Sequence, residues 1–311
     1  MSDKNLNAHP ATGDFGIVTI QPHEPRDAAE LVAMHTAAWA IADQAACDGA
    51  RLLVLPEYFN AMGLSPEQVR VEATRTDRFH AAARELCRRR SCWLVLPLIE
   101  CRGGAWLNTA HLYSPAGECV FTYDKTHITE SERDVYGLTP GDKLGVAQTP
   151  FGCLGIVICY DIYFPEVARA LALQGAQILV FPSLQRSDTP ERCMLLNRSR
   201  AVDSQAFLVR SSYGQPPDTP HERGRCYGGS CVIAPDGTVL ADAGLYGQAA
   251  EASVDPQWQW SRPTCGGMPP KSVREFLSAD RRPELYGLIG DNGTDERSLG
   301  QGRVPGEPRT K

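Results

Sequence analysis

A short run of apolar and small residues at 153–158, Cys-Leu-Gly-Ile-Val-Ile, constrains the fold of this chain more than any other feature. A strand without polar side chains has no face for water, so it belongs in the middle of a sheet that is covered on both faces. The run therefore indicates a layered α/β protein.

Helices and further strands alternate along the rest of the chain, as the apolar spacing and the turn residues predict. The expected helices cover 27–47, 78–90, 165–173 and 191–204. The expected strands cover 15–21, 51–55, 93–99, 108–113, 119–123, 144–149, 153–158, 178–181, 207–211, 229–233 and 239–241. This alternation indicates an α/β layer fold, and turns such as Pro235-Asp236-Gly237 indicate that its sheets are mixed.

Charge and hydropathy exclude several classes of partner. The chain has 31 basic and 37 acidic residues, a net charge of −6, so it has no electrostatic footprint for nucleic acid or an anionic membrane surface. Its polar start lacks the pattern of a signal peptide, and no apolar run approaches the roughly 18 residues that span a bilayer. We therefore expect a cytoplasmic protein with no membrane or nucleic-acid partner.

One large domain is expected at 15–290, a length that single α/β domains can reach. It contains no internal repeat and no obvious linker. A polar, flexible N-terminus at 1–14 precedes it, and a polar tail rich in Gly, Arg and Pro follows at 291–311.

The eleven cysteines do not follow a disulfide or zinc pattern. Their count is odd and no two form a Cys-x-x-Cys pair, which disfavours both a zinc site and a thiol-redox motif. In a reducing compartment most of them are small apolar residues of the core. We therefore expect no metal, and a reactive cysteine must be recognised by its surroundings.

Cys159 differs from the other cysteines in its position. It follows the central strand at 153–158, and a helix is expected to begin at Pro165. The turn between them exposes the cysteine, and nearby backbone N–H groups can face a bound anion. Taken alone, Cys159 is equally well explained as a buried core residue.

Glu57 and Lys125 also follow expected strands. A carboxylate at the end of an apolar strand is partly desolvated, which raises its pKa toward that of a useful base. A fixed ammonium group can lower a thiol pKa and stabilise an oxyanion. A single glutamate or lysine in such a position is more often a solvated surface residue. However, these two residues and Cys159 all follow expected strands, and α/β proteins form their sites at the edge of the sheet where strands end.

The motifs around these three residues resemble those of the nitrilase superfamily of carbon–nitrogen hydrolases. The matching segments are Leu55-Pro-Glu57-Tyr-Phe, Tyr123-Asp-Lys125-Thr-His and Cys159-Tyr-Asp-Ile-Tyr-Phe-Pro-Glu166, followed by 176–183, 197–205 and 227–230. The resemblance covers roughly 15–255. It implies that Glu57, Lys125 and Cys159 form a Glu–Lys–Cys catalytic triad.

The resemblance also implies a fold and an assembly. Members of the family are four-layer αββα sandwiches with two mixed β-sheets, and they commonly pair into homodimers near the element that carries the nucleophile. The resemblance implies neither a metal nor an organic cofactor. We therefore expect a hydrolase that acts on a small-molecule amide without a cofactor, as a homodimer or a larger homo-oligomer.

Many family members carry a second glutamate between the lysine and the cysteine. We assign this position to Glu132, with Glu130 and Asp134 as alternatives, and expect it to orient Lys125 or the substrate. The other expected oxyanion and substrate-binding residues are Tyr160, Tyr58, Tyr163 and Ser183.

In the expected mechanism, Glu57 takes the thiol proton and Cys159 attacks the amide carbonyl. Lys125 and the backbone N–H of Tyr160 hold the oxyanion, an amine or ammonia leaves, and water releases the acid from the thioester.

The residues after the nucleophile bear on the substrate. Some relatives that act on carboxylate-bearing substrates have an arginine there, whereas this chain has Asp161-Ile162-Tyr163. The absence of this guanidinium favours a neutral or weakly polar amide, although Arg186 or Arg192 could supply the charge from another loop.

Three alternatives follow from the same residues. A nitrilase or an N-carbamoyl amidohydrolase would use the same triad. A non-catalytic scaffold is disfavoured because Glu57, Lys125 and Cys159 are all present. A thiol-redox protein is disfavoured because there is no Cys-x-x-Cys pair.

Overall fold

The computed structural model describes residues 13–290 except 187, 218, 221, 223, 264, 265 and 267. Most of the expected N-terminal segment and the whole of the tail at 291–311 lie outside this range. The described residues divide into two compact units, 13–274 and 275–290, and the first contains all the strands described below. No helix in the described range combines the length and apolar character needed to cross a bilayer. The cytoplasmic location stays a prediction.

The first sheet has the strand order β12-β1-β2-β3-β4-β5. Its strands are β12 (Ala249–Val254), β1 (Phe15–Ile20), β2 (Leu52–Val54), β3 (Trp93–Arg102), β4 (Ala105–Tyr113) and β5 (Cys119–Asp124). The three strands β1, β2 and β3 are parallel, and the other neighbouring pairs are antiparallel. The sheet is therefore mixed.

The second sheet has the order β11-β10-β9-β8-β7-β6. Its strands are β11 (Val239–Asp242), β10 (Cys231–Ile233), β9 (Phe207–Ser211), β8 (Ile178–Pro182), β7 (Gly152–Ile156) and β6 (Val146–Thr149). Here too three neighbouring strands, β7, β8 and β9, are parallel, whereas the outer pairs are antiparallel. A small antiparallel pair, β13 (Ser261–Arg262) and β14 (Lys271–Ser272), stands apart from both sheets.

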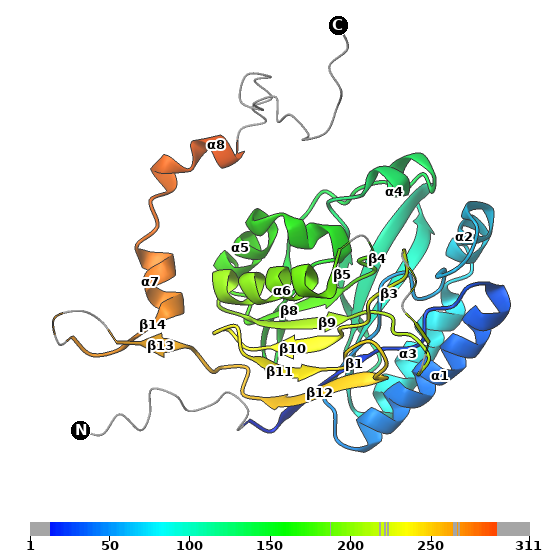
Figure 1. The fold of residues 1–311 in the computed structure, drawn as a ribbon, viewed down its shortest axis with the longest axis horizontal. Coiled ribbons are helices and arrows are strands. Elements are labelled where there is room, and N and C mark those ends of the chain that lie inside the picture. The colour runs from blue at the N-terminus through cyan, green and yellow to red at the C-terminus, as the bar shows by residue number, and fades with distance from the viewer. Residues whose placement is uncertain are drawn as a thin grey trace, which may run out of the picture. The chain divides into compact units, whose positions relative to one another are not determined.

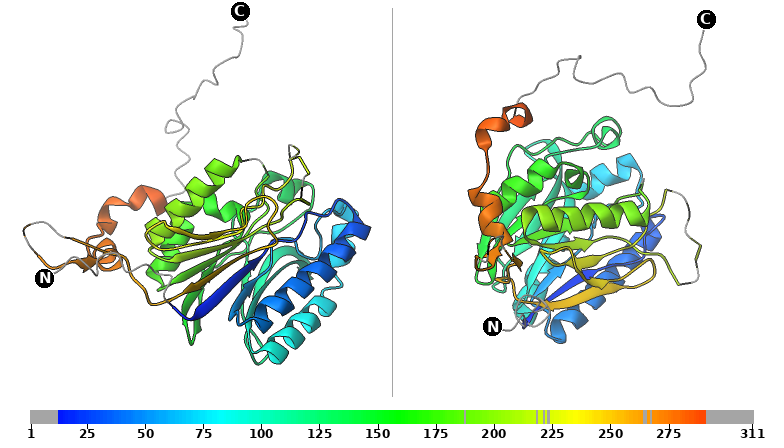
Figure 2. Two further views of the ribbon diagram at one scale, coloured as in Figure 1. Left: turned by 60° about the horizontal axis from the view of Figure 1, so that its bottom comes forward. Right: turned by 60° about the vertical axis from the view of Figure 1, so that its left-hand side comes forward.

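The two sheets face each other and share a core. Val54 and Val95 of the first sheet belong to the same buried cluster as Ile156 and Val180 of the second. Helices α1 (Ala28–Cys47) and α3 (Asp77–Arg90) cover the outer face of the first sheet, and α5 (Pro165–Leu173) and α6 (Pro190–Ser204) cover that of the second (Figures 1 and 2). The expected four-layer αββα sandwich is confirmed.

Short helices complete the structure: α2 (Pro66–Ala73), α4 (Glu130–Asp134), η2 (Cys159–Tyr163), α7 (Val273–Ala279), η4 (Pro283–Leu285) and α8 (Gly287–Gly290). Local sequence features explain where two of the covering helices begin. Asp27 caps α1 by accepting hydrogen bonds from the backbone N–H groups of Ala29 and Glu30. Pro165 begins α5.

Two of the differences from the sequence-based expectation have a clear physical reason. The central strand β7 ends at Ile156 rather than 158, because the chain bends toward the 3₁₀ helix that begins at Cys159. Strand β12 was not expected, since its sequence, Ala-Ala-Glu-Ala-Ser-Val, lacks the β-branched and aromatic residues that mark strands. Its pairing with β1 at the sheet edge supplies the order that local propensity does not.

Candidate active site

Three strands deliver the three residues of the expected triad to one cavity. Glu57 follows β2, Lys125 follows β5, and Cys159 comes three residues after the end of β7. All three line a cavity of about 430 Å³. Glu57 and Lys125 are almost completely buried, with 1% and 2% of their surface exposed, so their charges interact with little screening by water.

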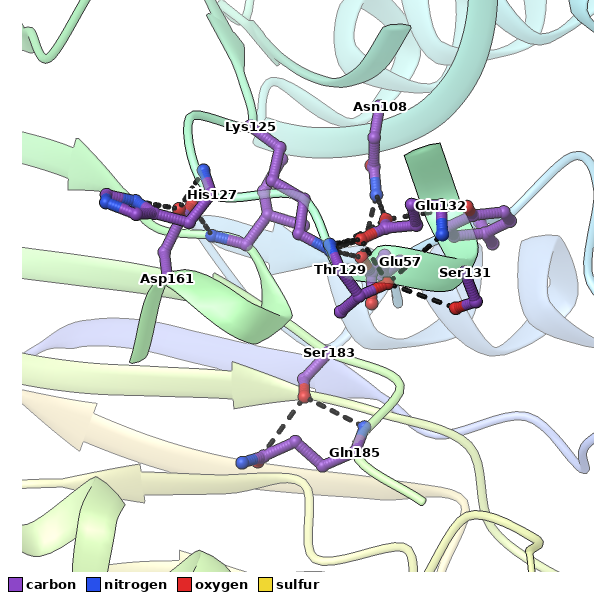
Figure 3. Close-up of polar contacts among 12 residues, drawn as sticks. Glu57, Asn108, Lys125, His127, Thr129, Ser131, Glu132, Asp161, Ser183 and Gln185 are labelled. Carbon is purple, nitrogen blue, oxygen red and sulfur yellow. Dashed lines mark hydrogen bonds and ion pairs between the residues drawn. The ribbon is translucent and has the colours of Figure 1, made fainter. Parts of the chain in front are cut away.

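The ammonium group of Lys125 lies between two carboxylates (Figure 3). Its Nζ donates to Oε1 of Glu57 at 2.9 Å and to both carboxylate oxygens of Glu132 at 2.8 Å. The side chain of Asn108, on β4, donates from Nδ2 to Oε1 of both glutamates, at 2.7 Å and 3.0 Å. Among the described residues, Oε2 of Glu57 has no hydrogen-bond partner, which leaves it able to accept a proton inside the cavity.

The arrangement shifts the pKa values of the two glutamates in opposite directions. Burial raises the pKa of Glu57; Lys125 opposes this shift, and the negative charge of Glu132 adds to it. Burial also acts to raise the pKa of Glu132, but Lys125 outweighs it and the pKa falls. Burial acts to lower the pKa of Lys125, but Glu57, Cys159 and Glu132 together raise it. Lys125 and Glu132 therefore stay ionised while Glu57 is suited to proton transfer.

Cys159 is the first residue of the 3₁₀ helix η2 and has a backbone φ of 44°. A non-glycine residue in this left-handed region stores strain of about 1–3 kcal/mol, a feature common at catalytic turns. Burial and the charge of Glu57 raise the thiol pKa well above its ordinary value. Cys159 is therefore a neutral thiol at rest and needs a base, since a thiolate would add a second net negative charge to the cluster.

Asp161 ties the nucleophile turn to the loop that carries Lys125. Its Oδ2 accepts from the backbone N–H of Ile158 at 2.9 Å and from the hydroxyl of Tyr123 at 2.8 Å. Its Oδ1 accepts from the backbone N–H of His127 at 3.0 Å. Sequence analysis gave no role to Asp161 or Asn108, because polar residues beside strands become informative only when their partners on other strands are known.

Helix α4 fixes Glu132 through a capping box. Thr129 Oγ1 accepts from the backbone N–H of Glu132 at 3.2 Å, and Glu132 Oε2 accepts from the backbone N–H of Thr129 at 2.8 Å. Glu130 and Asp134, the alternatives considered for this position, are exposed. The pattern Thr-x-x-Glu at 129–132 was a sequence signal that could have separated the three acidic residues.

The other expected site residues divide between the cavity and the core. Tyr58, Tyr160 and Tyr163 line the cavity, and the hydroxyl of Tyr58 lies 3.4 Å from Oε1 of Glu132. Ser183 is fully buried and does not line the cavity; its Oγ accepts from the backbone N–H of Gln185 at 3.3 Å (Figure 3). Gln185 lies in the cavity wall instead, together with the neighbouring Leu184 and Arg186.

The αββα fold and a cavity that holds a cysteine, a carboxylate and a fixed ammonium are the combination expected of a carbon–nitrogen hydrolase. The chain belongs to the carbon–nitrogen hydrolase family, whose family model matches residues 16–259. It is a hydrolase of the amidase type.

Named relatives and solved structures agree with this assignment. The chain is 32% identical to the deaminated glutathione amidase of Bos taurus over 265 residues, which cover 79% of this chain and 76% of that protein. It is 30% identical to the omega-amidase NIT2 of Danio rerio over 259 residues, which cover 78% and 89%. An amidase from Nesterenkonia sp., solved in complex with butyramide, superposes with a TM-score of 0.70 at 25% identity, covering 90% of this chain and 99% of that one.

Replacing Glu132 with Gln should shift the pH dependence of activity to lower pH. The negative charge of Glu132 raises the pKa of Glu57, so its removal lowers that pKa. If Glu57 acts as a base, activity is lost as the pH falls through its pKa, and the acidic limb of kcat/KM moves down in the variant. The measurement is a pH profile of kcat/KM for wild type and Glu132→Gln.

The matched control is Glu130→Gln, which removes an exposed charge from the same helix and should leave the acidic limb in place. An acidic limb that stays unchanged or moves to higher pH in Glu132→Gln would contradict the assignment of Glu57 as the base.

Proposed function

We propose that Cys159 cleaves a small amide through a thioester intermediate, with Glu57 as the base and Lys125 as the oxyanion partner. The observation that carries this proposal is the free Oε2 of Glu57, in the same cavity as Cys159, while its Oε1 is held by Lys125. A solved structure of the Nesterenkonia amidase, at 25% identity, shows the product of Michael addition of acrylamide to the active-site cysteine, which supports a cysteine nucleophile.

In the acylation step, Oε2 of Glu57 takes the proton from the Cys159 thiol, and the sulfur attacks the carbonyl carbon of the amide. The ammonium of Lys125 and the backbone N–H of Tyr160 stabilise the oxyanion that forms. When the tetrahedral intermediate collapses, the C–N bond breaks and the protonated Glu57 gives its proton to the leaving nitrogen. Ammonia or an amine departs, and the acyl group remains on Cys159.

In the deacylation step, Glu57 takes a proton from water, and the oxygen of that water attacks the thioester carbon. The C–S bond breaks, the carboxylic acid leaves, and the sulfur regains its proton from Glu57. Glu132 stays ionised throughout and keeps Lys125 in place, so it is a positioning residue. A nitrile or an N-carbamoyl substrate would enter through the same attack by Cys159, which makes these the alternative substrates to test.

The first experiment measures ammonia release from a panel of short amides, ureido compounds and nitriles. Wild type should release ammonia from at least one amide, and Cys159→Ala should lower kcat by roughly 10⁴-fold or more. The preferred member of the panel identifies the substrate class. Substantial turnover by Cys159→Ala would exclude Cys159 as the nucleophile, and release from nitriles alone would replace amidase with nitrilase activity.

Arg186 favours a second, more specific substrate class, an amide that carries a carboxylate. Its side chain lines the cavity and is 42% exposed, and one of its nitrogen atoms pairs with the buried Glu24 at 2.8 Å. A guanidinium has five N–H donors, so this pair leaves others for a substrate carboxylate. Arg192 does not line the cavity, pairs with Asp188 and is 64% exposed.

The variant Arg186→Gln tests this class against neutral amides. We expect kcat/KM to fall by about 10- to 100-fold for the monoamide of a short dicarboxylic acid, since a charge-assisted hydrogen bond contributes about 1.5–3 kcal/mol. For the neutral amide of the same chain length, it should change by less than about 3-fold. Arg192→Gln is the matched control and should alter neither value. If Arg186→Gln loses the same factor in kcat/KM for both substrates, Arg186 does not recognise a carboxylate, and a neutral amide remains the preferred substrate class.

We also infer that the protein forms a homodimer through the outer face of α5 and α6. Leu173 on α5 and Leu195 on α6 are 43% and 65% exposed, and the resemblance places the family interface near the element that carries the nucleophile, which α5 follows. Leu195→Glu should therefore lower the mass in analytical ultracentrifugation from that of a dimer to that of a monomer. Val32→Glu, at an equally exposed position on α1, should keep the dimer. A wild-type monomer would refute the inference.

A further inference from the structure

Two histidines and a glutamate converge at a second place in the fold, outside the cavity that contains Cys159. His80 belongs to α3, Glu100 to β3 and His111 to β4. The Nε2 atoms of His111 and His80 lie 3.1 Å and 3.7 Å from Oε2 of Glu100, and the three atoms all lie within 4.8 Å of one another. None of these residues lines the catalytic cavity.

The neighbours of these side chains fix which atoms face one another. Nδ1 of His80 lies 2.6 Å from the hydroxyl of Tyr113, and Nδ1 of His111 lies 3.1 Å from Oγ1 of Thr122. Oε2 of Glu100 only accepts, so Nε2 of His111 donates its hydrogen to it. A bound ion would replace that hydrogen, with each Nδ1–H donating to its hydroxyl and each Nε2 lone pair directed at the ion. Arg102 binds Oε1 of Glu100 at 2.9 Å, which leaves Oε2 for the two imidazoles.

We propose that His80, Glu100 and His111 form a binding site for a divalent transition-metal ion, with Zn²⁺ as the best match. Two imidazole nitrogens and one carboxylate oxygen are a donor set that Zn²⁺ and its neighbours in the first row prefer. Bonds of about 2.0–2.1 Å in a tetrahedron place ligand atoms roughly 3.3 Å apart, and the distances of 3.1 Å and 3.7 Å lie on either side of this value.

The surroundings of the cluster fit a metal site in two further respects. The second nitrogen of each histidine has a hydrogen-bond partner, as metal-bound imidazoles usually do: the hydroxyl of Tyr113 for His80, and for His111 the hydroxyl of Thr122 with the Cys119 thiol at 3.7 Å. The side chains of His80, Glu100 and His111 are 15%, 10% and 8% exposed, so the ion would be largely shielded from solvent, and His80 is the most exposed of the three ligands. Three protein ligands leave a fourth position for water.

The site differs from the expectation of no metal, which came from the absence of paired cysteine spacing. Its ligands come from one helix and two strands that meet only in the folded chain, so no local spacing marks them. An ion here would join α3 to β3 and β4 and would add its binding free energy to the stability of the fold.

Cobalt binding to the full-length protein tests the proposal. After dialysis against a chelator, the protein is titrated with Co²⁺ in mildly alkaline buffer, because protons compete for the same nitrogen atoms. We expect one equivalent to bind with visible d–d bands, without the near-ultraviolet charge-transfer band of a cysteine-bound ion. Zn²⁺ should displace the cobalt and raise the midpoint of thermal unfolding.

Variants assign the binding to this cluster. Co²⁺ binding should weaken by about 100-fold or more in His80→Gln, which changes a partly exposed position, and in Glu100→Gln. It should weaken by about 10-fold in Tyr113→Phe, which removes only the hydroxyl beside His80. His35→Gln is the matched control on α1 and should bind as wild type does. The proposal is overturned if no d–d bands appear, or if they persist unchanged in His80→Gln and Glu100→Gln. Circular dichroism confirms that each variant is folded.

Discussion

The active site depends on one buried cation held between two buried carboxylates. Removing three charges from water is costly, and the cost is offset only when each charge is paired and its remaining hydrogen bonds are made. Here Lys125 bonds to both Glu57 and Glu132, while Asn108 and Thr129 supply further donors. Burial, together with the negative charge of Glu57, raises the pKa of the Cys159 thiol and keeps it protonated at rest. The same arrangement leaves Glu57 with one carboxylate oxygen that no described residue binds.

The two sheets make this arrangement rigid. Glu57 and Lys125 follow strands of the first sheet and Cys159 follows a strand of the second, so the site spans the seam between the sheets. Asp161 links the two sides because its carboxylate bonds to the backbone on both the Cys159 side and the Lys125 side. The strained backbone of Cys159 is therefore maintained by hydrogen bonds that join its turn to a neighbouring element.

Sequence reasoning was strongest where a local pattern determines the structure. The apolar run at 153–158, the proline that begins α5 and the hairpin turn at 235–237 each specify a conformation through a few adjacent residues. It was weaker where partners lie far apart in the chain. Asn108 and the cluster around Glu100 can be recognised as sites only when the fold has brought their partners together. Those partners lie on other elements, such as Glu57 and Glu132 for Asn108 and His80 and His111 for Glu100. Ser183 shows the opposite case, since a motif indicated a substrate contact, whereas its buried side chain bonds to the backbone of its own loop.

The pairing of β1 with β12 bears on how the chain folds as it is synthesised. Phe15 is opposite Val254, so the first strand acquires its outer neighbour only after more than two hundred further residues have been made. Until then, one edge of the first sheet has unpaired backbone groups, which invite contacts with other chains. A contact this distant in sequence also costs loop entropy and slows the final closure of the sheet. The nascent protein is therefore most exposed to misassembly late in translation, when most of both sheets already exists but β12 is still missing.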